Sequence, residues 1–310
     1  MLNEVALTPD VFDAALYSSP DACDIHLRYI REPLLTEVLV RDLRDGAWSA
    51  HMAQTEGRWH LRGKELFRKL AAQSRLRRFR PSTVPDPQDD DQWCDEAVAS
   101  SQLESMAAII SSNAVASNHS SCPTVCSVER ATNSAWWQGR SPSRLVPRNM
   151  NAFMEALRLV LPNANSLMFI DSHLDPSQPR YGNFIQLLLA ARRDPPALLE
   201  VHRACYEGSG PKRIIFTGDG KADLEKRFRD NWSAHLVHAG IKVAVYVWPD
   251  THDRSLVTNL IGIELSNGFD ESNVQGDTVK FLRLGRVDAD AIQRKFDPAV
   301  NKPHYVIQLP

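Results

Sequence analysis

One segment, Ile241 to Asp270, constrains the fold of this chain more than any other. It opens with Ile241 to Trp248, an apolar run of β-branched and aromatic residues that lies between a glycine and a proline. This composition and these boundaries are typical of a strand that is buried in a sheet. The turn that follows contains His252 and Arg254, and the alternating sequence GIEL then predicts a second strand before Gly268.

The turn carries two side chains that suit phosphate chemistry. His252 and Arg254 stand two residues apart, so on an extended chain they point to the same face. A neutral imidazole attacks phosphorus or transfers a proton near neutral pH, and a guanidinium pairs with two phosphate oxygens at once. The pattern therefore predicts that one side chain reacts while the other holds the phosphate. A structural alternative is that Asp253 pairs with Arg254 and braces the turn.

The spacing of these residues resembles the signature of the phospholipase D superfamily, which is HxK, four residues, Asp, and then a glycine-containing strand. This chain reads HDR, SLVT and Asn259, so Arg254 replaces the lysine and Asn259 the aspartate. The arginine keeps the charge but changes the geometry. The resemblance implies a metal-independent phosphodiesterase without a cofactor, in which His252 is the nucleophile, Arg254 the phosphate clamp and Asn259 a third catalytic residue.

A narrower resemblance is to the phospholipase D-like C-terminal domain that follows MIT domains in eukaryotic membrane-trafficking proteins. The shared features are an HDR-containing strand, a turn like Gly268 to Asp270, and an upstream segment with Asp171, Arg180, Tyr181, Asn183 and Phe184. The resemblance covers about residues 166–310. In that family the fold has lost catalysis and binds acidic lipid head groups as a dimer, which implies binding without cleavage.

The two resemblances leave two functions open. The first is a phosphodiesterase of nuclease type that acts on nucleic acid or another phosphodiester. The chain looks bacterial, and similar domains attached to anti-phage defence systems imply a role in defence. The second is a catalytically inactive module that binds a phosphorylated ligand, a lipid head group or a partner protein as an adaptor. Single-motif members of the superfamily assemble their two-histidine site by homodimerising, so we expect a homodimer or a larger assembly.

The C-terminal half, residues 146–310, predicts an α/β fold. Strands over residues 166–174, 197–203 and 241–248 alternate with helices over residues 180–193 and 221–240, which is the order of a largely parallel sheet with flanking helices. Ligands bind at the carboxyl ends of such strands. The polar residues at these ends are therefore expected to bind substrate, and either histidine among them is a candidate for the second imidazole within one subunit: Asp171, His173, His202 and Arg203.

The N-terminal half, residues 1–145, shows helical spacing of its apolar residues, as in DACDIHLRYIREPLLTEVLVRDL, and predicts a mainly helical domain. The basic run from Arg75 to Arg80 stands beside two prolines and predicts a loop. His119, Cys122 and Cys126 suggest a zinc site, but structural zinc needs four ligands and no fourth lies nearby. We therefore expect no metal site here.

Composition limits the remaining classes. The formal net charge is −2, so any anion site must be local rather than a basic coat. No apolar run approaches the roughly 20 residues of a membrane helix. Five irregularly spaced cysteines fit a reducing compartment, and we expect a cytoplasmic protein. The sequence contains neither a Walker loop nor GxGxxG, so it predicts no nucleotide cofactor.

Overall fold

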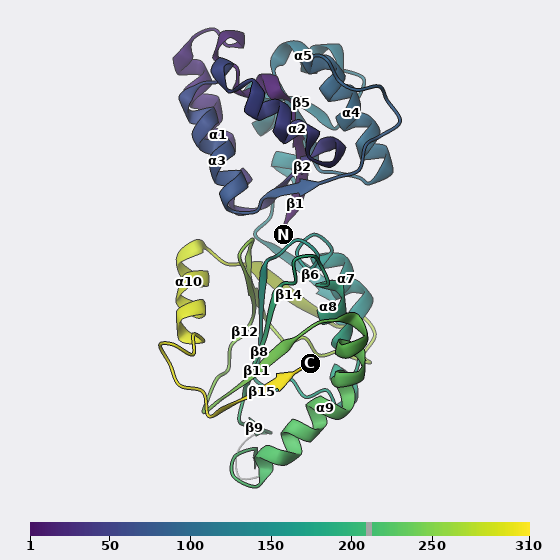
Figure 1. Cartoon of the computed structure of the whole chain (residues 1–310), viewed down its shortest axis with the longest axis vertical. Coiled ribbons are helices and arrows are strands. Elements are labelled where there is room, and N and C mark those ends of the chain that lie inside the picture. The colour runs from purple at the N-terminus through teal and green to yellow at the C-terminus, as the bar shows by residue number, and fades with distance from the viewer. Residues whose placement is uncertain (209–212) are drawn as a thin grey trace. The chain divides into compact units, whose positions relative to one another are not determined.

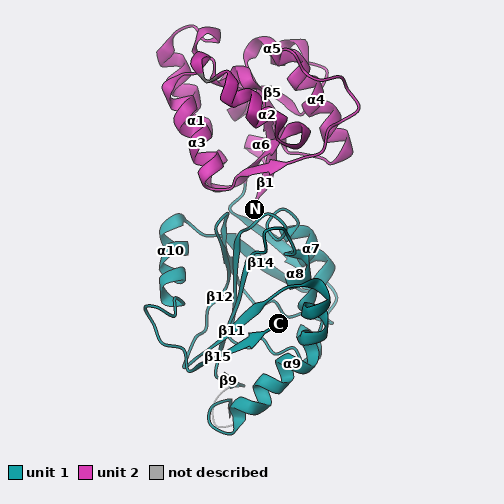
Figure 2. Cartoon of the chain, in the orientation of Figure 1, with its two compact units in different colours: residues 1, 141–310 teal, residues 2–140 magenta. Residues whose placement is uncertain are grey.

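The structure is a computed structural model that describes residues 1–208 and 213–310 (Figure 1). The chain forms two compact units, one of residues 2–140 and one of residue 1 with residues 141–310 (Figure 2). The change from one unit to the other therefore falls close to the boundary expected between residues 145 and 146. No helix of the described residues is long and apolar enough to cross a membrane.

The N-terminal unit is built on a parallel sheet of five strands in the order β3-β2-β1-β4-β5. Its strands are β1 (Asn3–Leu7), β2 (Val38–Asp42), β3 (Leu76–Arg78), β4 (Ala108–Ser111) and β5 (Val125–Ser127). Its helices are α1 (Pro20–Thr36), α2 (Leu43–Gln54), α3 (Leu61–Ala72), α4 (Asp90–Leu103), α5 (Asn113–Asn118) and α6 (Ala135–Gln138). The prediction of a mainly helical domain is therefore wrong for this unit, which is an α/β fold.

The error has a local cause. Helix α1 runs through Pro33 to Thr36, and β2 begins only two residues later. The apolar residues of the strand therefore continued the helical spacing of the helix. The strands are short and fully buried, and periodicity cannot distinguish such a strand from a buried helix segment.

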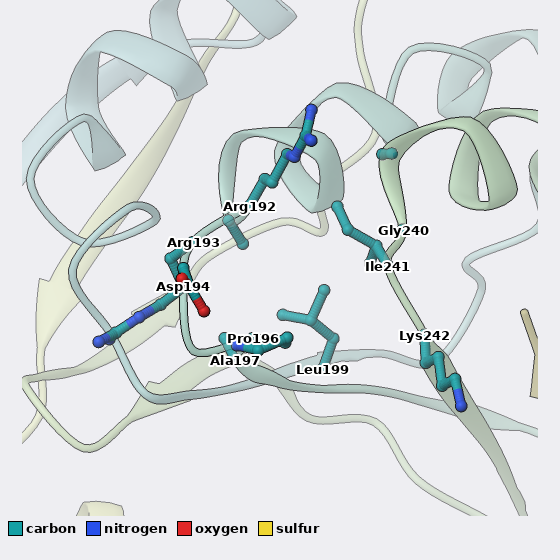
Figure 3. Close-up of a pocket in the computed structure, with 11 residues that line it drawn as sticks. Arg192, Arg193, Asp194, Pro196, Ala197, Leu199, Gly240, Ile241 and Lys242 are labelled. Carbon is teal, nitrogen blue, oxygen red and sulfur yellow. The ribbon is translucent and has the colours of Figure 1, made fainter.

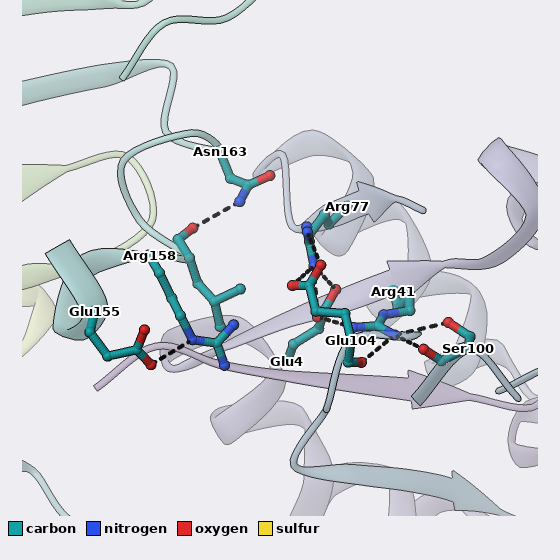
Figure 4. A network of polar contacts seen from close by, with 9 residues as sticks. Glu4, Arg41, Arg77, Ser100, Glu104, Glu155, Arg158 and Asn163 are labelled. Carbon is teal, nitrogen blue, oxygen red and sulfur yellow. Dashed lines mark hydrogen bonds and ion pairs between the residues drawn. The ribbon is translucent and has the colours of Figure 1, made fainter. Parts of the chain in front are cut away.

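A buried ion-pair network joins the strands of this sheet (Figure 4). Arg41 of β2 is inaccessible to solvent and donates to Glu4 of β1 at 2.5 Å and to the backbone carbonyl of Ser100 at 2.9 Å. Arg77 of β3 donates to the same glutamate at 2.8 Å and to Glu104. The basic run from residue 75 to residue 80 thus contains a strand rather than only a loop, and these arginines balance buried carboxylates.

The C-terminal unit contains an eight-stranded sheet in the order β15-β11-β8-β7-β12-β13-β14-β6. The strands are β6 (Ser143–Pro147), β7 (Ser166–Asp171), β8 (Leu198–Ala204), β11 (Val243–Trp248), β12 (Arg254–Thr258), β13 (Gly262–Leu265), β14 (Thr278–Arg283) and β15 (Tyr305–Leu309). Only β7, β8 and β11 run parallel, and every other pairing is antiparallel. The three predicted parallel strands are confirmed, and the sheet is mixed as expected, but most of its described pairings are antiparallel rather than parallel.

Helices cover both faces of this sheet (Figure 1). The helices α7 (Met150–Leu157), α8 (Ile185–Ala190) and α9 (Gly220–Ala239) pack on one face, where Phe169 meets Phe184 with their ring centroids 5.3 Å apart. Helix α10 (Arg286–Lys295) lies over β12 and β13 on the other face, above a small core that includes Ile170 and Phe296. Because side chains alternate along β7, this strand is buried from both sides.

Candidate phosphate-binding site

The sheet topology brings the predicted chemical residues to one edge. Strands β7, β8 and β11 are parallel, so their carboxyl ends share that edge. Strand β12 runs antiparallel to β7 and starts with Arg254 directly opposite Asp171. The turn that carries His252 therefore meets the end of β7, and the segment that organises the sequence also reaches the ligand-binding edge of the sheet.

Tyr206 lies between two imidazoles at this edge. It opens the short strand β9 (Tyr206–Glu207), just after β8, and its ring centroid is 6.2 Å from that of His173 and 6.3 Å from that of His252. Its hydroxyl donates to Asp250 Oδ1 at 2.6 Å. Burial and this carboxylate raise the pKa of Tyr206 to about 12, so the phenol stays protonated and holds Asp250 in place at neutral pH.

His173 is half-buried beside several cations. Burial lowers the pKa of the His173 imidazole, and Arg254 and Arg180 lower it further, whereas Asp171 opposes them. The imidazole is therefore neutral at pH 7, which is the form that acts as a nucleophile or base. Arg254 starts β12 directly opposite Asp171, which stands two residues before His173.

The other imidazole has a different environment. The side chain of His252 is 73% exposed, and its Nε2 lies 3.7 Å from Asp250 Oδ1. This separation is too long for a hydrogen bond, so the imidazole has no hydrogen bond to this carboxylate. The two histidines thus differ in exposure, since His173 is half-buried and His252 faces solvent.

Arg254 is free to bind an anion. Within residues 1–208 and 213–310 no hydrogen bond or ion pair engages its guanidinium, although the side chain is only partly exposed. Its neighbour Asp253 bonds instead to Lys295 at 2.5 Å and to Thr251 at 2.8 Å. The alternative in which Asp253 pairs with Arg254 is therefore not the arrangement found.

Asp171 anchors the backbone around His173. The carboxylate is fully buried and accepts hydrogen bonds from the backbone N–H of His173 at 3.0 Å, from that of Phe269 at 2.9 Å and from the Tyr181 hydroxyl at 3.1 Å. Burial raises the pKa of Asp171, and these three donors oppose that effect. The residue predicted to bind substrate therefore fixes the position of a neighbouring side chain instead of facing solvent.

Two further predicted residues, both on β8, lie away from this cluster. Arg203 is buried and donates to three backbone carbonyls, including that of Leu174 at 2.8 Å. His202 is buried on the α10 face, where it stacks on Tyr246 and accepts a hydrogen bond from Trp248. Both positions result from alternation along β8, which sends successive side chains to opposite faces, and neither leaves a group free for substrate.

Asn259 lies at the far end of β12 from Arg254. Its Oδ1 accepts a hydrogen bond from the backbone N–H of Asn165 at 2.7 Å, next to the first residue of β7. The strand thus separates Asn259 from both histidines, and the structure does not place it with the other residues of the motif. The spacing in sequence was misleading because all five residues of β12 are extended.

An open groove of about 850 Å³ extends from the histidine turn toward α10. It is lined by cationic side chains and by a similar number of carboxylates: His252, Arg254, Arg283, Lys295, Asp250, Asp253, Glu264 and Asp288. The groove thus has mixed charge. Such a lining suits one phosphate with a polar substituent better than a long polyanion.

Sequence reasoning missed Tyr206, Asp250 and the groove beside α10. Asp250 stands two residues before His252 in the sequence PDTHDR, so it was available as a signal. Tyr206 belongs to a strand of two residues, which is too short to show a periodic pattern in the sequence. Only the parallel pairing of β8, which precedes it, brings it close to the histidines. At the zinc candidate, His119 bonds to Asp95, and no cluster of three or more metal-ligating side chains occurs in the part of the chain that the structure describes.

Comparisons with known proteins add little to this geometry. No family model matches the chain, and no curated protein matches it. Among solved structures, a polyphosphate kinase from Porphyromonas gingivalis is similar with a TM-score of 0.30 and 13% identity over 50% of this chain and 24% of the kinase. An archaeal chromatin protein, TrmBL2, has a TM-score of 0.32 and 12% identity over 82% of this chain and 86% of its own. The chain thus spans about a quarter of the kinase.

Proposed function

We propose that the C-terminal unit binds a phosphodiester at the edge formed by His173, His252 and Arg254 and cleaves it without a metal ion. The observation that carries the proposal is that the rings of His173 and His252 both lie near Tyr206, at centroid distances of 6.2 and 6.3 Å, where β12 begins with Arg254. A phosphodiesterase with a covalent intermediate needs a nucleophile, an acid and a cation for the non-bridging oxygens. These three roles match the three side chains.

The electrostatics favour one assignment of the roles. The resemblance implied attack by His252, but His173 has the lowered pKa and the more buried imidazole, so we assign attack to His173. A nitrogen of His173 bonds to phosphorus as the bond to the leaving oxygen breaks, and protonated His252 gives its proton to that oxygen. Water then attacks the phosphohistidine, gives its proton to His252 and restores His173. Arg254 neutralises the non-bridging oxygens in both steps.

The substrate class is the next part of the proposal. The resemblance to phospholipase D suggests nucleic acid, and a role in bacterial defence against phage rests on that resemblance alone. The mixed charge of the groove favours a phosphodiester with a polar substituent. A panel should therefore contain DNA, RNA and small phosphodiester reporters, all assayed in EDTA.

A second function, binding without cleavage, is favoured by one observation. Within the described ranges no hydrogen bond orients a ring nitrogen of His173 or His252, and catalytic histidines are usually held by such a bond. In this alternative Arg254 binds a phosphorylated ligand or lipid head group, and the imidazoles only complete the pocket. Binding would then survive loss of either imidazole.

The experiment compares wild type with His173→Ala, His252→Ala and Arg254→Gln. His238→Ala is the matched control, because this exposed histidine is in the last turn of α9. We expect EDTA-resistant cleavage that falls about 100-fold or more in both site-histidine variants and is unchanged in the control. Cleavage that persists in both variants, or an inert wild type on every substrate, would refute the enzyme. Binding lost only in Arg254→Gln would support the module.

A further inference from the structure

A second pocket lies at the opposite edge of the same sheet. Its volume is about 540 Å³, and it is formed where β8 and β11 begin and where α8 and α9 end (Figure 3). The floor is aliphatic, with the buried side chains of Leu199 and Ile241. A pocket of this size with an apolar floor is typical of a ligand site. None of the residues assigned to phosphate chemistry lines it.

Three cations surround the aliphatic floor. Figure 3 shows the ends of Arg192, Arg193 and Lys242 directed away from one another at the rim. Arg193 donates to the backbone carbonyl of Asn163 at 3.0 Å. In the described part of the chain, no hydrogen bond or ion pair uses the charged groups of Arg192 and Lys242. Two rim cations are therefore available to a ligand.

This arrangement does not suit a single small anion. The three cations diverge, so one phosphate or carboxylate cannot reach all of them. The carboxyl ends of α8 and α9 face the pocket, and their partial negative charge opposes an anion at its centre. Asp194 adds a full negative charge to the wall. The favourable ligand is instead apolar at the centre and acidic at its edges.

The lining also argues against nucleic acid. Single-stranded nucleic acid is held by a continuous basic track and by aromatic rings on which bases stack. No aromatic residue is among the described residues that line this pocket, and Asp194 interrupts the basic rim. Aliphatic contacts and separated cations are instead the features that a short peptide with an aliphatic anchor and acidic flanks would use.

We infer that this pocket is a docking site for an acidic peptide segment of a partner protein, which inserts one aliphatic side chain between Leu199 and Ile241. The carboxylates that flank this anchor meet Arg192 and Lys242 at the rim. The site lies at the other end of the strands from His173, so it does not depend on the proposed phosphate chemistry.

The test is fluorescence anisotropy of a labelled peptide that carries one leucine flanked by glutamates, added to the full chain. Reversing both rim charges with Arg192→Glu and Lys242→Glu should weaken binding about tenfold or more. Ala197→Asp puts a carboxylate on the floor and should also abolish binding. Arg286→Glu is the control, because this side chain on α10 is 84% exposed and lies outside the pocket.

Three further probes decide between ligand classes. A peptide with serine in place of leucine and a peptide with lysine in place of glutamate should both bind at least about tenfold more weakly. Failure of the acidic peptide to bind, or equal binding by the Ala197→Asp variant, would overturn the inference. Binding of a thymidine oligonucleotide that is lost in the charge-reversal variants would reassign the surface to nucleic acid. Circular dichroism of each variant checks that the fold is retained.

Discussion

The close approach of Gly268 to Asp171 makes a substitution at this glycine the sharpest structural test of the site. A Cβ at Gly268 would overlap Asp171 Oδ2 and lie 2.8 Å from its Cγ. The backbone dihedral φ of this glycine is not in the positive region, so the conflict arises from space alone. Gly268→Ala must therefore displace the carboxylate that holds the backbone N–H groups of Phe269 and His173.

The magnitude follows from the hydrogen bonds at risk. Hydrogen bonds to a charged group contribute about 1.5–3 kcal/mol each, and Asp171 has no access to water that would replace them. Loss of one or two of these bonds predicts that the free energy of unfolding falls by about 2–4 kcal/mol. Urea unfolding of the full chain measures this change, and amide hydrogen exchange at Phe269 shows whether it is local.

A control and a cycle make the test specific. Gly182→Ala is the matched control, because a Cβ there lies 3.4 Å from the carbonyl of Pro179, an ordinary contact, and should change stability by less than about 0.5 kcal/mol. In an Asp171→Ala background, Gly268→Ala should cost little, since the two effects share one contact. The reasoning would be refuted if Gly268→Ala were as stable as wild type, or if the destabilising effects of Gly268→Ala and Asp171→Ala were additive.

Three other properties follow from the structure. Asn259→Ala removes the acceptor for the backbone before β7 and should lower the free energy of unfolding by about 1 kcal/mol in urea, while phosphodiester binding is unchanged. Burial and Asp10 raise the pKa of Asp90 to about 6, which is above its value in the unfolded chain, so the folded protein loses stability as pH rises through 6. Asp90→Asn should therefore be about 1 kcal/mol more stable than wild type near pH 7.5 and equally stable near pH 4. Burial lowers the pKa of His202, so the imidazole binds a proton more readily in the unfolded chain than in the folded one. The melting temperature should therefore fall as pH drops below about 6.5, and it should fall less in His202→Gln than in wild type.

The sequence predicted those parts of the fold whose patterns are long and clearly bounded. The strand ending at Trp248 is bounded by a turn, and helix α9 ends at Gly240, which adopts the left-handed conformation at its C-terminus. The N-terminal sheet escaped prediction because its strands contain three to five residues, and β2 and β4 are buried on both faces. A run so short carries too few alternations to show a period of two.

The site was predicted in part for a similar reason. His252, Arg254 and His173 follow strands that the sequence defines, so a parallel order was enough to expect them at one edge. His202 and Arg203 also lie at the end of a predicted strand. The face of the sheet on which each side chain lies depends on the register of that strand, which the sequence alone does not fix. Tyr206 became visible only when the strands were paired in space.

The most direct measurement of the central claim is identification of the histidine that becomes phosphorylated. Wild type and His252→Gln would be mixed with a phosphodiester in EDTA, quenched under alkaline conditions that preserve phosphohistidine, and analysed by peptide mass spectrometry. With a phosphodiester whose leaving group needs no protonation, we expect an adduct on His173 that accumulates in His252→Gln, because the base that activates water is then missing. An adduct on another residue, or turnover without any adduct, would contradict this account.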